Sequence, residues 1–226
     1  GAGGRIVAQL MHCGRAASRF NKADDAETVA PSAVRAAGKI YTDSAGMQEH
    51  DMPRALGLAE IRGVIEEYAT ATRNALAAGF DGVELHCTSG YLPMQFMATN
   101  SNLRTDAYGG SAPNRVRFVV EVTEAMVGVA GRGRVGLRIC PGNPFNDVDD
   151  PEPAVTYEAL LARIAGLELA FLEVVRSPRK DFDAFGFARA HFKGPLILND
   201  SFDGASASQA VADGHGAAVS FARHFI

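Results

Sequence analysis

The chain lacks the features that mark several large classes of protein. Its three cysteines, Cys13, Cys87 and Cys140, are odd in number and widely spaced, which fits neither a disulfide framework nor a zinc site and predicts a reducing compartment, by default the cytoplasm. No apolar run approaches the ~20 residues that a membrane span needs. The first residues do not show the basic and then apolar pattern of a signal peptide.

Positive charge is not in excess either. The 22 lysines and arginines are outnumbered by 26 acidic residues, giving a net charge of −4, so we expect neither nucleic acid nor a membrane surface as a partner. No group of His, Asp or Glu has metal-ligand spacing, and no metal is predicted. With 47% hydrophobic and 21% charged residues, the composition is that of an ordinary globular protein.

The hydrophobic pattern alternates between strands and helices. It predicts strands at 5–12, 83–86, 134–140, 170–175, 194–199 and 217–221, and helices at 58–78, 114–129, 156–167 and 205–213. Residues 176–192 have the pattern of a loop with weak helical character. Strands that alternate with helices pair in parallel through right-handed crossovers, so we predict one α/β domain over residues 1–226.

Residues 16–57 interrupt this alternation with a long stretch that has no regular pattern. Loops of this length are uncommon in compact domains and are usually functional or disordered. We therefore expect 16–57 to be a long loop over the face formed by the C-terminal ends of the strands.

Three polar side chains follow the predicted strand at 83–86. His86, Ser89 and Tyr91 leave its C-terminal end together, where proteins built from βα units place their chemistry. On this pattern alone, a strand end with purely local hydrogen bonds is an equally good interpretation.

Several segments together resemble the old yellow enzyme family of flavin-dependent oxidoreductases. They include Ala-Gly-Phe-Asp-Gly-Val-Glu-Leu-His (78–86) and Ser-Asn-Leu-Arg-Thr-Asp-Ala-Tyr-Gly-Gly-Ser (101–111). The other matching segments lie at 3–15, 30–33, 90–92, 95–96, 114–118 and 135–138. They follow the family's order along nearly the whole chain.

The resemblance implies a TIM (β/α)8-barrel fold, of which this chain would hold about six βα units. The chain would begin at the family's third strand and stop just after its eighth, leaving the barrel incomplete with two open edges. The sequence leaves three explanations of the incomplete barrel open: the chain is a fragment, it is a shortened natural form, or its barrel is completed by a second copy or a complementing chain.

The resemblance also implies FMN as cofactor and NAD(P)H as reductant. Gln9 matches the residue that hydrogen-bonds the flavin pyrimidine edge, and Arg138 the residue beside the flavin N1–O2 edge. The turn Asn199, Asp200 and Ser201, together with Ala222 and Arg223, matches the phosphate-binding positions. From the residues alone, the alternatives are that Gln9 is a buried structural amide and Arg138 a member of a strand-end ion pair.

The substrate implied by the resemblance is a small electrophilic alkene. His86 and Ser89 match the positions that hydrogen-bond the activating oxygen of this substrate, and Tyr91 matches the position of the proton donor. Ser89 replaces the usual Asn or His, which predicts slow turnover on simple enones. Asp200 stands in a turn that is usually glycine-rich, so it either points into solvent or weakens FMN binding.

Two functions remain open from the sequence. The first is an FMN-dependent NAD(P)H oxidoreductase that reduces activated C=C bonds. The second is a non-catalytic or flavin-poor relative that acts as a scaffold or assembly subunit.

Overall fold

Six parallel strands form a curled, open sheet in the computed structural model, which describes residues 3–222. Neighbouring strands in the sheet follow the chain order without exception, as in a barrel wound in one direction. The strands are β1 (Val7–Leu10), β6 (Gly82–Cys87), β7 (Val135–Ile139), β8 (Phe171–Val175), β9 (Leu196–Asn199) and β10 (Ala218–Ser220). The prediction of six parallel strands is confirmed, with bounds shifted by at most two residues.

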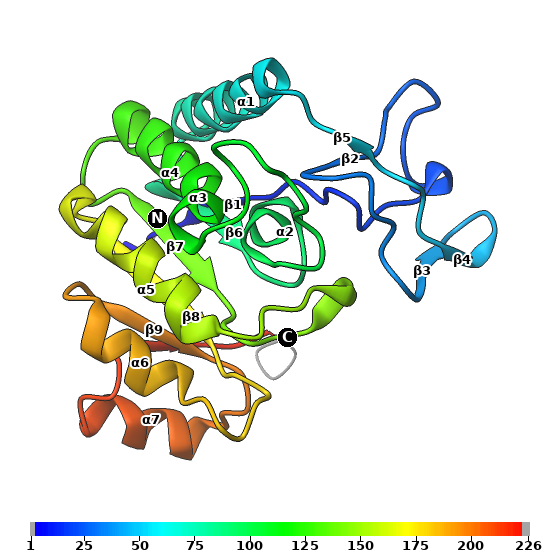
Figure 1. Cartoon of the computed structure of the whole chain (residues 1–226). Coiled ribbons are helices and arrows are strands. Elements are labelled where there is room, and N and C mark those ends of the chain that lie inside the picture. The colour runs from blue at the N-terminus through cyan, green and yellow to red at the C-terminus, as the bar shows by residue number, and fades with distance from the viewer. Residues whose placement is uncertain (1–2, 223–226) are drawn as a thin grey trace.

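Helices cover only one face of this sheet (Figure 1). Each connects one strand to the next, which gives the parallel pairing its crossovers. The crossover helices are α1 (Leu58–Ala77), α4 (Arg117–Ala130), α5 (Pro153–Ile164), α6 (Ala184–His191) and α7 (Gly204–Ala212). The segment 176–192 thus holds a regular helix where the sequence predicted a loop with weak helical character. Asp183 begins this helix by accepting a hydrogen bond from the backbone of Phe185.

Alternate side chains of the strands face two different environments. One set is apolar and packs against the helices: Val83, Leu85, Val135, Leu137, Ile139, Leu172, Val174, Leu196 and Leu198, all buried. The other set faces the concave side of the sheet and is largely polar. Period-two alternation therefore separates a core made by strands and helices from the face on which a site can be built.

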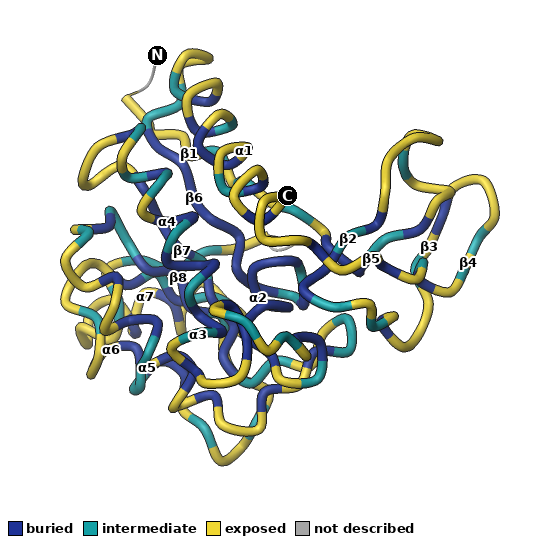
Figure 2. The backbone as a smooth tube through the Cα atoms, turned by 45° about the horizontal axis from the view of Figure 1, so that its top comes forward, coloured by how far each residue is buried: buried dark blue, intermediate teal, exposed yellow. Residues whose placement is uncertain are grey.

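The segment 16–57 is more regular than its sequence suggests. It contains a parallel pair, β2 (Val29–Ala30) with β5 (Arg54–Ala55), and an antiparallel hairpin, β3 (Lys39–Thr42) with β4 (Gly46–Glu49). A 3-10 turn, η1 (Arg19–Asn21), precedes them. The segment extends beyond the C-terminal ends of β1 and β6 (Figure 1), and much of it is exposed (Figure 2). Strands of two residues leave no periodic signal, which is why the sequence predicted an irregular loop.

The Asn-x-Arg-Thr-Asp motif fastens this segment to the domain. Arg104 donates hydrogen bonds to the carbonyls of Pro31 (2.8 Å) and Leu56 (2.6 Å), the residues that directly follow β2 and β5. Asp106 holds the same guanidinium through two bonds of 3.1 and 2.6 Å. This motif therefore has a structural role here.

Two short helices lie between β6 and α4; the first was not predicted from the sequence, and the second overlaps the start of the predicted helix 114–129. They are α2 (Leu92–Met97) and α3 (Ala112–Arg115). Every residue of α2 is buried, so it lacks the alternation of apolar and polar faces by which helices are recognised. Within the described part of the chain, no helix has the length and apolar character to cross a membrane.

Candidate functional site

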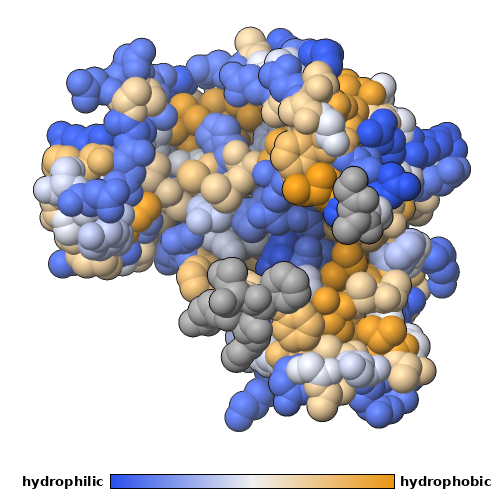
Figure 3. Space-filling view, turned by 180° about the vertical axis from the view of Figure 1, so that it is seen from behind, coloured by the Kyte–Doolittle hydropathy of each residue, from blue (hydrophilic) through white to orange (hydrophobic). Residues whose placement is uncertain are grey.

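The concave face of the sheet is lined with polar and charged side chains. Seen from behind, the molecule has a hydrophilic hollow between apolar borders (Figure 3). Each strand contributes one or two of these groups: Gln9, Glu84, His86, Arg138, Glu173, Asn199 and Ser220. Most are buried or half-buried, so their charges and hydrogen bonds must be satisfied by one another or by a ligand.

His86 and Tyr91 come together at the end of β6. Their ring centroids lie 5.3 Å apart with an interplanar angle of 44°. Burial lowers the pKa of His86 from 6.5 to about 4, helped by the nearby Arg138 cation, so the imidazole is neutral at physiological pH. Burial also raises the pKa of Tyr91 above 10, which keeps its phenol protonated. The pair therefore offers a neutral imidazole and a proton donor side by side.

Thr88 links His86 to Ser89. The Thr88 hydroxyl lies 3.0 Å from Nε2 of His86 and 3.1 Å from the Ser89 hydroxyl. The other ring nitrogen of His86, Nδ1, is buried and has no partner among the described residues. The three candidate residues are thus brought together as predicted, but the Ser89 hydroxyl is engaged by Thr88, a residue that sequence reasoning missed.

The turn that carries Ser89 has a strained backbone, which contacts with the loop after β7 hold in place. Ser89 has φ 57°, in the left-handed region that serine rarely adopts. Its carbonyl accepts a hydrogen bond of 2.7 Å from the Asn146 side chain. The next residue, Gly90 (φ 69°), lies so close to the carbonyl oxygen of Phe145 that a Cβ would be 2.2 Å away. The loop after β7 therefore sets the shape of the turn after β6.

Gln95 joins this turn to the loop after β1. It is fully buried and donates to the carbonyls of Gly90 (2.7 Å) and Cys13 (3.0 Å) while accepting from the backbone N–H of Arg15 (3.0 Å). The amide therefore holds the exits of two neighbouring strands at a fixed separation.

Arg138 belongs to a closed ring of hydrogen bonds across four strands. Its guanidinium pairs with Glu173 on β8 and donates to Asn199 on β9 (2.7 Å). Asn199 donates to the Ser220 hydroxyl on β10 (2.8 Å), which in turn donates to Glu173 (2.6 Å). The ring fixes the orientation of both Arg138 and Asn199. Its other two members, Glu173 and Ser220, were not candidates from the sequence.

Gln9 is held at the other side of the sheet by a second carboxylate. Its amide nitrogen donates to Glu84 at 2.6 Å, which leaves the amide oxygen available. Glu84 is 5% exposed, and burial raises its pKa from 4.5 to about 8, with the nearby Glu173 acting in the same direction. Two buried carboxyl groups and one guanidinium thus determine the charge of this interior.

A cavity of about 350 Å³ opens beyond β9 and β10. It is lined by the predicted phosphate-binding residues Asn199, Asp200, Ser201 and Ala222, together with Phe202, Ser220 and Phe221. Asp200 (φ 81°) and Ser201 (φ 61°) both adopt the backbone conformation that favours glycine. Asp200 is exposed and its carboxylate accepts a bond from Ser201. The fifth predicted residue, Arg223, lies outside the described residues.

The whole chain matches one protein family. The profile of the NADH:flavin oxidoreductase / NADH oxidase family aligns with residues 1–226. This chain belongs to that family. It is 40% identical over 227 residues to a probable flavin mononucleotide-dependent alkene reductase of Leishmania infantum, covering 97% of this chain and 62% of that protein. A putative 12-oxophytodienoate reductase 5 of Oryza sativa subsp. japonica is 33% identical, with 99% and 61% covered.

Solved structures of the NADH:flavin oxidoreductase family superpose closely on the fold. The old yellow enzyme homologue of Zymomonas mobilis matches with a TM-score of 0.93 and 34% identity, over 100% of this chain and 64% of that one. Morphinone reductase in complex with tetrahydroNAD matches with a TM-score of 0.91 and 37% identity, over 99% and 63%. The curled sheet of six strands is thus part of an incomplete TIM barrel, and the chain spans a little over three fifths of its relatives.

The residues on the concave face fit the FMN that the family name implies. Arg138 Nε and His86 Nδ1 are buried without partners among the described residues. The Gln9 amide oxygen and the left-handed turn at Asp200 and Ser201 offer further groups of the kinds that a flavin edge and a phosphate need. Gln9 and Arg138 could therefore hold the flavin ring on one side of the sheet, and the turn after β9 could hold the phosphate on the other.

Proposed function

We propose that the protein is an FMN-dependent NAD(P)H oxidoreductase that reduces activated C=C bonds of small electrophilic alkenes. The observation that carries the proposal is the pairing of a neutral His86 with a protonated Tyr91, 5.3 Å apart, at the exit of β6. A donor to the substrate oxygen and an acid for its α-carbon are the two protein groups that this reaction requires.

Each residue has a distinct part in the proposed reaction. His86 donates a hydrogen bond to the oxygen conjugated with the alkene, where negative charge develops in the transition state. Tyr91 gives its phenolic proton to the α-carbon. Ser89 is the weaker donor, because its hydroxyl is already within 3.1 Å of Thr88. Bound FMN, reduced by NAD(P)H, would supply the hydride to the β-carbon.

The cofactor would be held by Gln9, Arg138 and the turn after β9. Gln9 presents its amide oxygen to the pyrimidine edge, while Arg138 presents Nε to the N1–O2 side. Asn199, Asp200, Ser201, Ala222 and Arg223 form the proposed phosphate site. The Asp200 carboxylate points to Ser201 and solvent, which removes part of its repulsion toward a phosphate.

Absorbance and single-turnover kinetics test the proposal. Protein reconstituted with FMN should show a bound-flavin spectrum and, once reduced without oxygen, should be reoxidised by an enone. The alternative of a non-catalytic scaffold is favoured by the internal partners of Gln9 and Arg138, because Glu84 and Glu173 already hold these side chains in place without a cofactor. Protein that stays colourless after reconstitution would contradict the proposal and support that alternative.

The proposal also includes a cytoplasmic location and a partner at the sheet edges. Within residues 3–222, β1 and β10 each pair on one side only, which leaves unpaired backbone groups at both edges of the six-stranded sheet. A second copy or a complementing chain could cover them, and sedimentation analysis of the purified chain measures whether it associates.

A further inference from the structure

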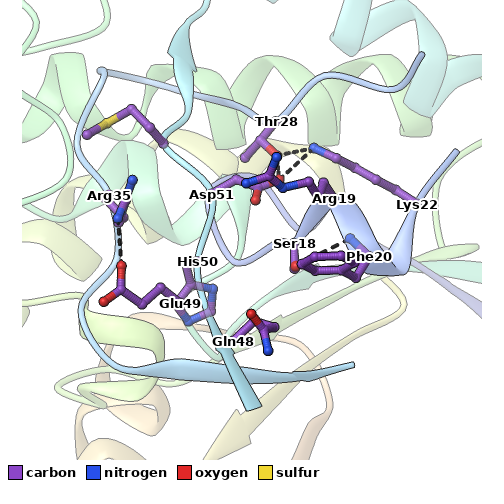
Figure 4. Close-up of a pocket in the computed structure, with 11 residues that line it drawn as sticks. Ser18, Arg19, Phe20, Lys22, Thr28, Arg35, Gln48, Glu49, His50 and Asp51 are labelled. Carbon is purple, nitrogen blue, oxygen red and sulfur yellow. Dashed lines mark hydrogen bonds and ion pairs between the residues drawn. The ribbon is translucent and has the colours of Figure 1, made fainter. Parts of the chain in front are cut away.

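A cavity of about 660 Å³ lies within the segment 16–57. Its walls come from the residues around η1, from those at the end of β4, and from Thr28 and Arg35, and no residue of the six-stranded sheet lines it. Figure 4 shows charged side chains on several sides of a common space, with Arg35 and Glu49 together on one side and Lys22 with Thr28 on another. The cavity is large enough for a small organic molecule.

The charges that line this cavity do not cancel. Lys22 pairs with Asp51 at 3.1 Å, and Arg35 pairs with Glu49 at 2.8 Å through Nη1 alone. Arg19 has no ion pair among the described residues, and its guanidinium lies 5.7 Å from the Phe20 ring centroid. Three cations and two carboxylates leave one positive charge uncompensated.

A buried histidine completes the lining. His50 is 3% exposed, and its Nδ1 has no hydrogen-bond partner in the described part of the chain. A buried polar group without a partner is costly, which indicates that something else satisfies it. Burial and the Arg15 cation behind it lower its pKa, so the ring is neutral and can donate one N–H.

We propose that this cavity binds a phosphate or carboxylate group of a small molecule, with Arg19, Arg35 and His50 donating to its oxygens. Arg19 supplies the uncompensated charge, and Arg35 supplies the N–H groups that its bond to Glu49 leaves free. Charge-assisted hydrogen bonds of this kind are the stronger ones in proteins. The site goes beyond the proposed reductase function and does not depend on FMN, since it lies in a different part of the fold.

Titrations of the ¹⁵N-labelled full chain at low ionic strength test the site. Inorganic phosphate, succinate, NADP⁺ and NAD⁺ are added in turn, and amide shifts are followed. We expect saturable shifts at residues 18–22 and 48–52 with at least one of these probes. Arg19→Gln should weaken that binding roughly tenfold, the effect of losing one charged hydrogen bond. Arg62→Gln, an exposed arginine on α1, is the matched control and should bind as the unmodified chain does.

The arms of the experiment separate the sources of the anion. Saturation by phosphate and by NADP⁺ but not NAD⁺ identifies a phosphate monoester, whereas saturation by succinate alone identifies a carboxylate. Shifts confined to residues 199–202 would place the anion in the cavity beyond β9 and overturn the inference. Unchanged affinity in both Arg19→Gln and Arg35→Gln would also overturn it. A protein that binds the anion here but never retains FMN would refute the proposed function and leave this site standing.

Discussion

Ser89 combines an unusual backbone conformation with a side chain turned toward Thr88. Its φ of 57° is one that asparagine adopts more readily than serine. Ser89→Asn should therefore raise the free energy of unfolding by roughly 0.5 kcal/mol, measured by urea denaturation. Ser44→Asn, in an exposed turn outside the left-handed region, is the control and should show no comparable gain.

Ser89→Asn also tests whether Ser89 limits the rate of the proposed reaction. A carboxamide reaches further than a hydroxyl, so Ser89→Asn should add a second donor to the substrate oxygen. One such donor contributes about 3 kcal/mol to transition-state stabilisation, and we expect faster reduction of simple enones in single-turnover experiments. A variant that is more stable but no faster would show that Ser89 does not limit the rate.

Tyr91 is expected to act as an acid in only one half of the reaction. Tyr91→Phe should slow reoxidation of the reduced enzyme by an enone by roughly 10²–10⁴-fold, the usual contribution of a positioned acid. Reduction by NAD(P)H should proceed at its original rate, because no proton from Tyr91 is needed there. Stopped-flow absorbance of the flavin separates the two steps. Tyr41→Phe, on the exposed hairpin, controls for loss of a phenol elsewhere and should change neither.

At the scale of elements, the turn after β6 depends on a close approach to the loop after β7. Gly90→Ala would place a methyl group 2.2 Å from the Phe145 carbonyl oxygen at a φ of 69°, so we expect a destabilisation of more than about 2 kcal/mol. Gly128→Ala is the matched control, because it lies within α4 with open space around its Cβ. A helical Gly→Ala change should stabilise by about 0.5–1 kcal/mol. Urea denaturation measures the change in unfolding free energy of both variants. Equal changes would contradict the close contact between Gly90 and Phe145.

The elements that the sequence predicted well are those with strong hydrophobic periodicity. The six strands and the helix α1 were predicted to within a few residues of their observed bounds. Val83 and Leu85 are buried at the two-residue spacing of a strand, and Ile61 and Val64 are buried at the three-residue spacing of a helix. The helix α2 was missed because it is buried all round, and the β2–β5 pair because two residues carry no period.

The sequence predicted which residues meet at the end of β6 but not how the polar groups of the concave face are connected. His86, Ser89 and Tyr91 are near neighbours in sequence, so their meeting at one strand end followed from the strand itself. The ring through Glu173 and Ser220 could not be predicted this way. Its members lie on different strands, and only the register of the curled sheet brings them into contact.

At the scale of the whole molecule, the buried carboxyl group of Glu84 makes the stability of the fold depend on pH. The raised pKa of Glu84, from 4.5 to about 8, means that the folded chain holds a proton that the unfolded chain has already released. This group's contribution to stability is therefore complete below about pH 4.5 and is lost as the pH rises toward 8. His86 acts at the acid end, where its lowered pKa costs stability as the pH falls from 6.5 toward 4.

Glu84→Gln isolates the first of these effects. The amide cannot ionise, so the variant should gain stability relative to the unmodified chain as the pH rises from about 5 to about 9, by at least about 1 kcal/mol across that range. His86 is present in both proteins, and its contribution cancels in the difference. Urea denaturation at several pH values measures that difference, and Glu124→Gln, at an exposed position on α4, should follow the unmodified profile. Parallel profiles for Glu84→Gln and the unmodified chain would mean that Glu84 is ionised in the folded interior. Gln9 would then donate its hydrogen bond to a buried carboxylate rather than to a carboxylic acid.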